Sequence, residues 1–180
     1  MTPDLQNEFE LLAADARQRL REVSCSGSYR QVFSFWTMPS FSPCSRWTIY
    51  SPQPFGKVDR PFASYTIWRS DLDLEKLKSP VERLKFPKHL APTVQEDIVQ
   101  LTEVEVQKIE RQISGIAIPI CPDECAVTVL DGTRFEFRHD QLFFGGSLHW
   151  WENHPSEWRP FTEVIRRIAA ELEQRRKEKS

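Results

Sequence analysis

The sequence has 180 residues, of which 39% are hydrophobic and 28% charged, with a formal net charge of -2 and an isoelectric point of about 6.1. A chain of this length can bury a core as one globular domain, residues 1–180, without help from a disulfide or a metal. The small net charge predicts no long-range attraction to nucleic acid, and no stretch approaches the ~20 apolar residues of a membrane span.

The N-terminal segment predicts an amphipathic helix over residues 4–23. Its apolar residues recur at steps of three and four, with acids in the first half and arginines in the second, which suits the helix dipole. A secretory signal needs an uninterrupted apolar core, which this segment lacks. We therefore expect a cytoplasmic protein whose cysteines are reduced.

Residues 28–69 change character, because aromatic and β-branched residues dominate there and prolines separate the runs. Ser70-Asp71 then predicts the cap of a short helical turn that ends before Pro80. The strands predicted from the aromatic runs lie near residues 29–37, 45–50 and 62–69.

The middle of the chain predicts further helix. Val94, Ile98 and Leu101 have helical spacing, which indicates a helix from residue 93. The run TEVE at residues 102–105 has the form of a capping box that begins a further helical segment, and Gly115 is placed to end it. Two helices and one bent helix both fit this pattern.

Residues 116–160 predict a strand meander that precedes a final helix. IAIPI at 116–120 suggests an edge strand, since Pro119 cannot sit in the centre of a sheet. Asp131-Gly132, between AVTVL and TRFEF, predicts a hairpin turn. The strands expected here lie near 126–130, 133–138 and 141–150, and an apolar face from Phe161 onward predicts the C-terminal helix. Together these elements predict an α+β fold: an antiparallel β-sheet meander with the N- and C-terminal helices packed on one face.

Short runs in the second half of the chain form a recognisable set: SPVERLK at 79–85, IPI at 118–120, LDGT at 130–133, Trp150-Trp151, and Pro155 to Trp158 before the last helix. In this set the chain resembles a family of uncharacterised small bacterial single-domain proteins of unknown function. Some small proteins of this general build are suspected to be antitoxin-like binding proteins. The resemblance implies the fold, and it carries no catalytic motif over to this sequence.

The four cysteines give little sign of a zinc or redox site. Cys121 and Cys125 have three residues between them, where a structural zinc site or a redox motif more often has two. Cys25 and Cys44 form no second close pair. We expect ordinary reduced cysteines and neither a metal nor a cofactor, although a Cys121–Cys125 disulfide or metal pair stays open.

Four residues could in principle support hydrolysis, because His139, Asp140, His149 and His154 fall within a span of sixteen residues. Such a cluster could hold a metal or act as acid and base. However, metalloprotease, nucleophile-elbow and phosphate-loop motifs are all missing from the sequence, and polar residues are expected at a turn in any case. A metal-dependent or acid/base hydrolase is therefore the alternative hypothesis, with no catalytic residue assigned.

The tryptophans carry the main functional hypothesis. Six Trp and 12 Phe exceed what a core of this size needs, and Trp is enriched at protein interfaces. Neighbouring strand residues point to opposite faces, so Trp150 and Trp151 cannot both enter one core layer. We expect a non-catalytic module that binds a protein partner, immunity-like or adaptor-like, and binds neither nucleic acid nor membrane; a small-ligand carrier with an aromatic pocket is a further alternative. The predicted binding residues are Trp150, Trp151, Trp158, His149 and His154.

Overall fold

The computed structural model describes residues 3–22, 28–40, 43–53, 60–79, 81, 90–119, 132–140 and 145–179. In chain order its elements are α1 (Pro3–Glu22), β1 (Tyr29–Pro39), β2 (Ser45–Pro52), β3 (Phe62–Trp68), α2 (Ser70–Lys78), β4 (Val94–Gln100), α4 (Glu103–Ser114), β5 (Thr133–Asp140), β6 (Gly145–Trp151), the 3-10 turn η1 (Ser156–Trp158) and α5 (Arg159–Lys179). The six strands form one antiparallel sheet in the order β4-β3-β2-β1-β5-β6, so β4 and β6 are its edges. The predicted α+β class, antiparallel sheet and terminal helices are confirmed.

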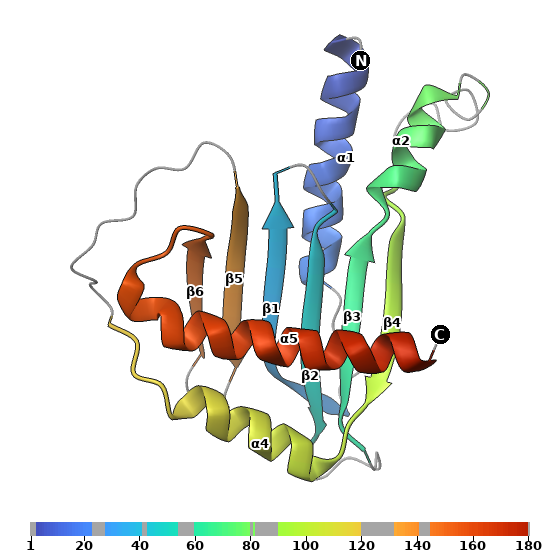
Figure 1. The fold of residues 1–180 in the computed structure, drawn as a ribbon. Coiled ribbons are helices and arrows are strands. Elements are labelled where there is room, and N and C mark those ends of the chain that lie inside the picture. The colour runs from blue at the N-terminus through green and yellow to red at the C-terminus, as the bar shows by residue number, and fades with distance from the viewer. Residues whose placement is uncertain are drawn as a thin grey trace.

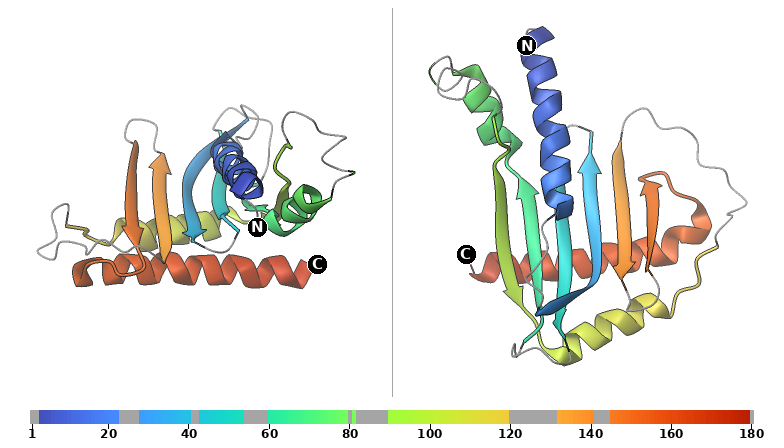
Figure 2. Two further views of the ribbon diagram at one scale, coloured as in Figure 1. Left: turned by 90° about the horizontal axis from the view of Figure 1, so that it is seen from above. Right: turned by 180° about the vertical axis from the view of Figure 1, so that it is seen from behind.

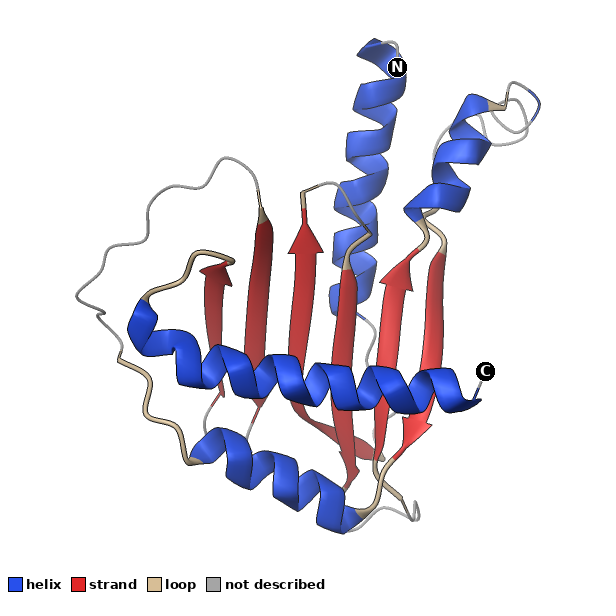
Figure 3. Cartoon of the chain, in the orientation of Figure 1, coloured by secondary structure: helices blue, strands red, loops and turns tan. Residues whose placement is uncertain are grey.

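Helix α5 crosses every strand on what we call the first face of the sheet (Figures 1 and 3). Its 21 residues extend about 31 Å, which exceeds the roughly 24 Å width of six paired strands. One helix can therefore cover the whole sheet. The core beneath it includes Phe33, Phe35, Trp47, Ile49, Phe137, Trp150, Phe161, Ile165 and Ile168, and Val106 and Ile109 of α4 join it.

Helix α1 lies on the opposite, second face and runs along the strands (Figures 1 and 2). Leu12 and Ala16 pack there against Trp36 and Trp68. The expectation that the N- and C-terminal helices share one face is therefore wrong. The physical reason is visible in β1, where Phe35 belongs to the first-face core and its neighbour Trp36 to the second. Since adjacent strand residues point to opposite faces, both faces carry large apolar side chains and both need cover.

Asp73, near the start of α2, is fully buried and joins three segments. Trp68 Nε1 at the end of β3 donates to it at 2.9 Å, the Thr93 backbone N–H donates at 2.7 Å, and Lys76 Nζ donates at 3.1 Å. The Thr93 hydroxyl is a fourth donor. Burial raises the pKa of this carboxyl, but the hydrogen bonds from Thr93, Trp68 and Lys76 outweigh burial and hold the pKa below its ordinary value. Asp73 thus fixes α2 against the β3 and β4 ends of the sheet.

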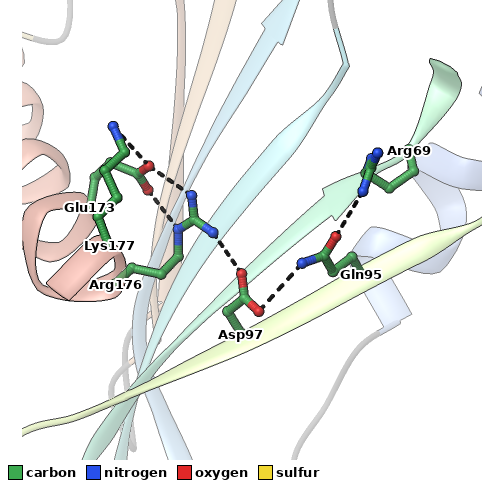
Figure 4. A network of polar contacts seen from close by, with 6 residues as sticks. All are labelled: Arg69, Gln95, Asp97, Glu173, Arg176 and Lys177. Atoms are coloured by element: carbon green, nitrogen blue, oxygen red, sulfur yellow. Dashed lines mark hydrogen bonds and ion pairs between the residues drawn. The ribbon is translucent and has the colours of Figure 1, made fainter. Parts of the chain in front are cut away.

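A second polar network fastens the end of α5 to β4 (Figure 4). Arg176 donates to both carboxylate oxygens of Glu173, at 2.9 and 2.8 Å, and to Asp97 Oδ2 at 2.7 Å. Asp97 Oδ1 accepts from Gln95 Nε2 at 3.5 Å, and Gln95 Oε1 accepts from Arg69 at 3.1 Å. These side chains place charge along the β4 edge and hold the far end of α5 over it.

The predicted helix from residue 93 is wrong, because Val94–Gln100 form edge strand β4. This segment pairs with β3 over its full length, with Val99 opposite Ala63. Val99 is buried and Ile98 is 51% exposed, which follows strand alternation rather than a helical face. Pairing with β3 overrides the local spacing. The capping box at Thr102 and the helix end at Gly115 are confirmed.

The edge strand expected at residues 116–120 is also wrong. Residues 116–119 form no strand, and the edges of the sheet are β4 and β6 instead. The strand expected near 126–130 and the Asp131 side of the hairpin turn lie outside the described residues, and the described neighbours of β5 are β1 and β6. Gly132 has a φ of 145°, which favours glycine. The Gly132 N–H donates to the Ser40 hydroxyl oxygen at 3.2 Å, and the Ser40 hydroxyl donates to the Gly132 carbonyl at 2.8 Å.

Replacing Asp73 with asparagine should lower the free energy of unfolding at pH 7 by about 2–4 kcal/mol, because a buried anion loses its charge-assisted hydrogen bonds. The folded-state pKa of Asp73 is lowered, so its contribution is present above the unfolded pKa of about 4 and is lost as the pH falls through the folded value. Urea unfolding at several pH values measures both effects. The exposed Asp71→Asn is the matched control and should change little; equal losses for the two variants would contradict this role.

Candidate functional site

Strands β5 and β6 present a polar surface on the second face of the sheet. Their alternate residues Phe135, Phe137, Leu148 and Trp150 pack in the first-face core, so the residues between them point the other way. Helix α1 lies over the middle strands and leaves β5 and β6 uncovered on this side (Figure 2, right). We call this surface the β5–β6 patch; it consists of Arg134, Glu136, Arg138, Ser147, His149 and Trp151.

Glu136 is the buried centre of the patch, with only 9% of the residue exposed. Its Oε2 lies 3.6 Å from His149 Nδ1 on β6 and 3.9 Å from Arg21 Nη2 on α1. At this distance the Arg21 contact is an ion pair rather than a hydrogen bond, and the His149 contact is an ion pair only when the imidazole is protonated. Oε2 has no hydrogen-bond partner in the described structure. Arg21 of α1 is therefore the permanent cation that faces the Glu136 carboxylate.

Arg46 holds the end of α1 beside the patch. It is 4% exposed, and its Nη1 donates to the carbonyl oxygens of Leu20 at 2.6 Å and Arg21 at 3.3 Å. A cation at these last carbonyls suits the negative end of the helix dipole. The guanidinium groups of Arg46 and Arg21 also lie 5.3 and 5.8 Å from the ring centroid of Trp36, within cation–π range. Arg46 thereby positions Arg21 near Glu136.

His149 has two polar neighbours at one ring nitrogen. Its Nδ1 lies 3.3 Å from Arg134 Nη2 and 3.6 Å from Glu136 Oε2. A guanidinium can only donate, so the neutral imidazole accepts from Arg134, whereas a protonated Nδ1 can only donate toward the carboxylate. The His149 side chain is 41% exposed, so the ring lies partly at the surface of the patch.

The two adjacent tryptophans take the opposite faces expected from strand alternation. Trp150 is 5% exposed and its ring centroid lies 5.7 Å from that of Phe161 in α5. Trp151 lies on the second face, opposite Arg134 in the strand register, and is partly exposed. Trp158 packs against the first-face core and donates from Nε1 to the Pro119 carbonyl at 3.2 Å. Of the three, Trp151 is the one that belongs to the β5–β6 patch.

The four residues of the hydrolase hypothesis are not gathered at one point. His139 stacks beside Phe137 on the first face, whereas His149 lies on the second. His154 uses both ring nitrogens near the start of α5, with Nδ1 2.9 Å from the Pro155 carbonyl and Nε2 2.9 Å from the Thr162 hydroxyl. The side chain of Asp140 is outside the described structure. Among the described residues no group of His, Cys, Asp or Glu could hold a metal ion.

Neither the cysteine nor the cavity among the described residues has the features of a reactive or ligand-binding site. Cys44 is a buried free thiol whose pKa is raised by burial; Cys25, Cys121 and Cys125 lie outside the described residues. A cavity of about 100 Å³ between α4 and α5 is lined by apolar and charged residues and by no aromatic one. Two of its lining residues, Glu105 and Arg175, form an ion pair, and the hydrogen bond from Arg175 lowers the pKa of Glu105 to about 2.

Sequence reasoning identified Trp151 and His149 but missed Arg134, Glu136 and Arg138. The signal was present in TRFEFRHD, where aromatic and charged residues alternate strictly, as in a strand with one buried face. Arg46 and Arg21 could not be found in this way, because 25 residues separate them in sequence and α1 brings them to one side of Trp36.

Neither a protein-family model, nor a curated protein, nor a solved structure gives a match to this chain, so the resemblance to small bacterial proteins stays a prediction. None of the described helices has the length and apolar composition needed to cross a membrane.

Replacing Arg46 with alanine should lower the free energy of unfolding by about 2–4 kcal/mol, because the α1 carbonyls and Gln31 lose a buried charged donor. Arg46→Lys should recover only part of this, since an ammonium cannot reproduce the planar fork that reaches both partners. Urea unfolding followed by tryptophan fluorescence measures the effect. The exposed Arg166→Ala, which removes only a cation–π contact 5.6 Å from Phe135, is the control. Full stability in Arg46→Lys would contradict the assigned geometry.

Proposed function

We propose that this protein is a non-catalytic, immunity-like or adaptor-like binding module, and that its protein partner docks on the β5–β6 patch. The main support is the second face of β5 and β6, which no described helix covers and where the partly exposed Trp151 lies opposite Arg134. Trp and Arg are the residue types most enriched among the energetic hot spots of protein interfaces.

The chemistry of the patch suits recognition better than catalysis. Its one buried carboxylate, Glu136, is already paired with Arg21 of α1. His139 and His149 point to opposite faces of the sheet, so they do not converge on one substrate atom. A strand surface with one large aromatic ring and exposed arginine side chains offers contact area and charge, which are features of protein interfaces.

The cavity between α4 and α5 gives no support to the alternative of a small-ligand carrier. Its volume of about 100 Å³ falls below the roughly 300 Å³ at which small-molecule pockets begin. The ion pair between Glu105 and Arg175 lies in its lining, so an apolar ligand would gain little there. The proposal therefore places binding on the outer surface.

Trp151→Ala should weaken partner binding at least tenfold, or by about 1.4 kcal/mol, if this ring is a central contact. The partner would first be isolated with the wild-type chain as bait and then titrated against purified variants by calorimetry. Val104→Ala removes an apolar side chain that is 74% exposed on α4 and should leave affinity unchanged.

Arg134→Glu should also weaken binding, because it reverses a charge beside Trp151. Circular dichroism of each variant separates a lost contact from a lost fold. Wild-type affinity in both Trp151→Ala and Arg134→Glu would show that the partner does not use the β5–β6 patch.

A further inference from the structure

Strand β6 exposes one complete row of backbone hydrogen-bonding groups. The Glu152 N–H donates to the Thr133 carbonyl at 2.9 Å, which fixes the phase of the β5–β6 ladder. In an antiparallel pair, hydrogen-bonded positions alternate, so Leu148 and Trp150 point their backbone groups toward β5. The backbone groups of Ser147, His149 and Trp151 therefore point outward. In the described structure these outward groups have no backbone partner.

The two edges of the sheet differ in how they are protected. Strand β4, VQEDIVQ, carries Glu96 and Asp97, and Asp97 is held under Arg176 of α5. Charged residues on an edge strand oppose pairing with another chain. Strand β6, GGSLHWW, has neither a proline nor an acidic or basic residue other than His149. The β6 edge thus has the form of an open template for strand addition.

We infer that β6 accepts an extended acidic segment of the partner protein as a seventh, antiparallel strand; this inference rests on the proposed function and specifies its binding mode. The positive charge of Arg134 is the reason for expecting an acidic segment. Arg134 contacts only the His149 ring among the described residues, and its guanidinium forms no ion pair there. In the described structure Glu136 forms its ion pair with Arg21 and not with Arg134.

The two faces of β6 set the pattern of the added strand. On the second face it would lie beside Ser147, His149 and Trp151, with Arg134 one strand away, so acidic residues fit there. On the first face it would lie beside Leu148 and Trp150, which pack in the apolar core, so apolar residues fit there. A segment that alternates acidic and β-branched residues satisfies both faces.

Pairing between two copies of this chain offers no charge complementarity. An edge-to-edge contact of β6 with β6 would be isologous, so that a residue i of one copy would lie opposite a residue j of the other, and j opposite i. Strand β6 carries no acidic residue, so neither copy would present a β6 carboxylate to Arg134 of the other. An acidic segment supplies the charge that a second β6 strand lacks.

An octapeptide of alternating Glu and Val, labelled with fluorescein, tests the inference directly against the full chain. Fluorescence anisotropy should show saturable binding that weakens with added salt, and the matching Lys–Val peptide should bind at least tenfold more weakly. Ser147→Pro removes one outward N–H without breaking a bond to β5 and should reduce affinity at least tenfold, whereas Ser147→Ala should retain it. Equal binding of the Glu and Lys peptides would overturn the charge assignment.

Amide hydrogen exchange supplies a second readout that needs no variant. On addition of the Glu–Val peptide, the amides of Ser147, His149 and Trp151 should become protected, while those of Leu148 and Trp150 should already be protected in the free protein. Unchanged exchange at the three outward amides, or concentration-dependent self-association through β6, would overturn strand addition. If Trp151→Ala abolishes partner binding while Ser147→Pro does not, strand addition fails and the proposed function stands. If neither variant affects partner binding, the proposed function fails as well.

Discussion

The direction in which each terminal helix crosses the sheet governs the rest of this structure. Helices α1 and α5 are nearly equal in length, at 20 and 21 residues. Helix α5 runs across the strands and covers all of them, whereas α1 runs along the strands (Figure 1). A helix is only about 10 Å wide, so one that follows the strands covers roughly two of them. The described helices therefore leave the second face of β5 and β6 uncovered, and the residues of these strands on that face can be polar.

Buried and partly buried arginines fix the elements on either side of this surface. Arg46 is nearly buried and binds the last carbonyls of α1, so the helix ends beside Trp36 with Arg21 over Glu136. At the opposite edge of the sheet, Arg176 of α5 donates to Asp97 of β4, so charged side chains lie along that strand. One edge of the sheet is thus closed by α5 and its ion pairs, while β6 carries no comparable charge. This asymmetry between the two edges is the reason for proposing β6, rather than β4, as the edge that a partner would pair with.

Much of the fold could be predicted from local patterns, because those patterns report local physics. The terminal helices, the first three strands and the Thr102 capping box follow from periodicity and capping chemistry. β4 could not be predicted, because its sequence fits a helical face and only pairing with β3 makes it a strand. The faces of the two terminal helices were also predicted wrongly. In hindsight, Phe35-Trp36 in one strand indicated that both faces needed cover.

The candidate site shows the same division between local and long-range information. Strand alternation predicted that Trp150 and Trp151 point to opposite faces, and the register places them so. Alternation could not say which one lies under α5, because the path of that helix is set by the whole first-face core. The partners of Glu136 were likewise hidden, since Arg21 lies in α1 and His149 on the next strand. Long-range packing, rather than any motif, assembles the patch.

In this structure α5 buries Trp150, while Trp151 is partly exposed on the second face of the sheet. Fluorine NMR of the protein labelled with 5-fluorotryptophan tests it directly, with Trp150→Phe and Trp151→Phe used to assign the two signals. A soluble paramagnetic agent should broaden the Trp151 signal and leave the Trp150 signal sharp. Equal protection of both rings, or broadening of Trp150 alone, would contradict this account.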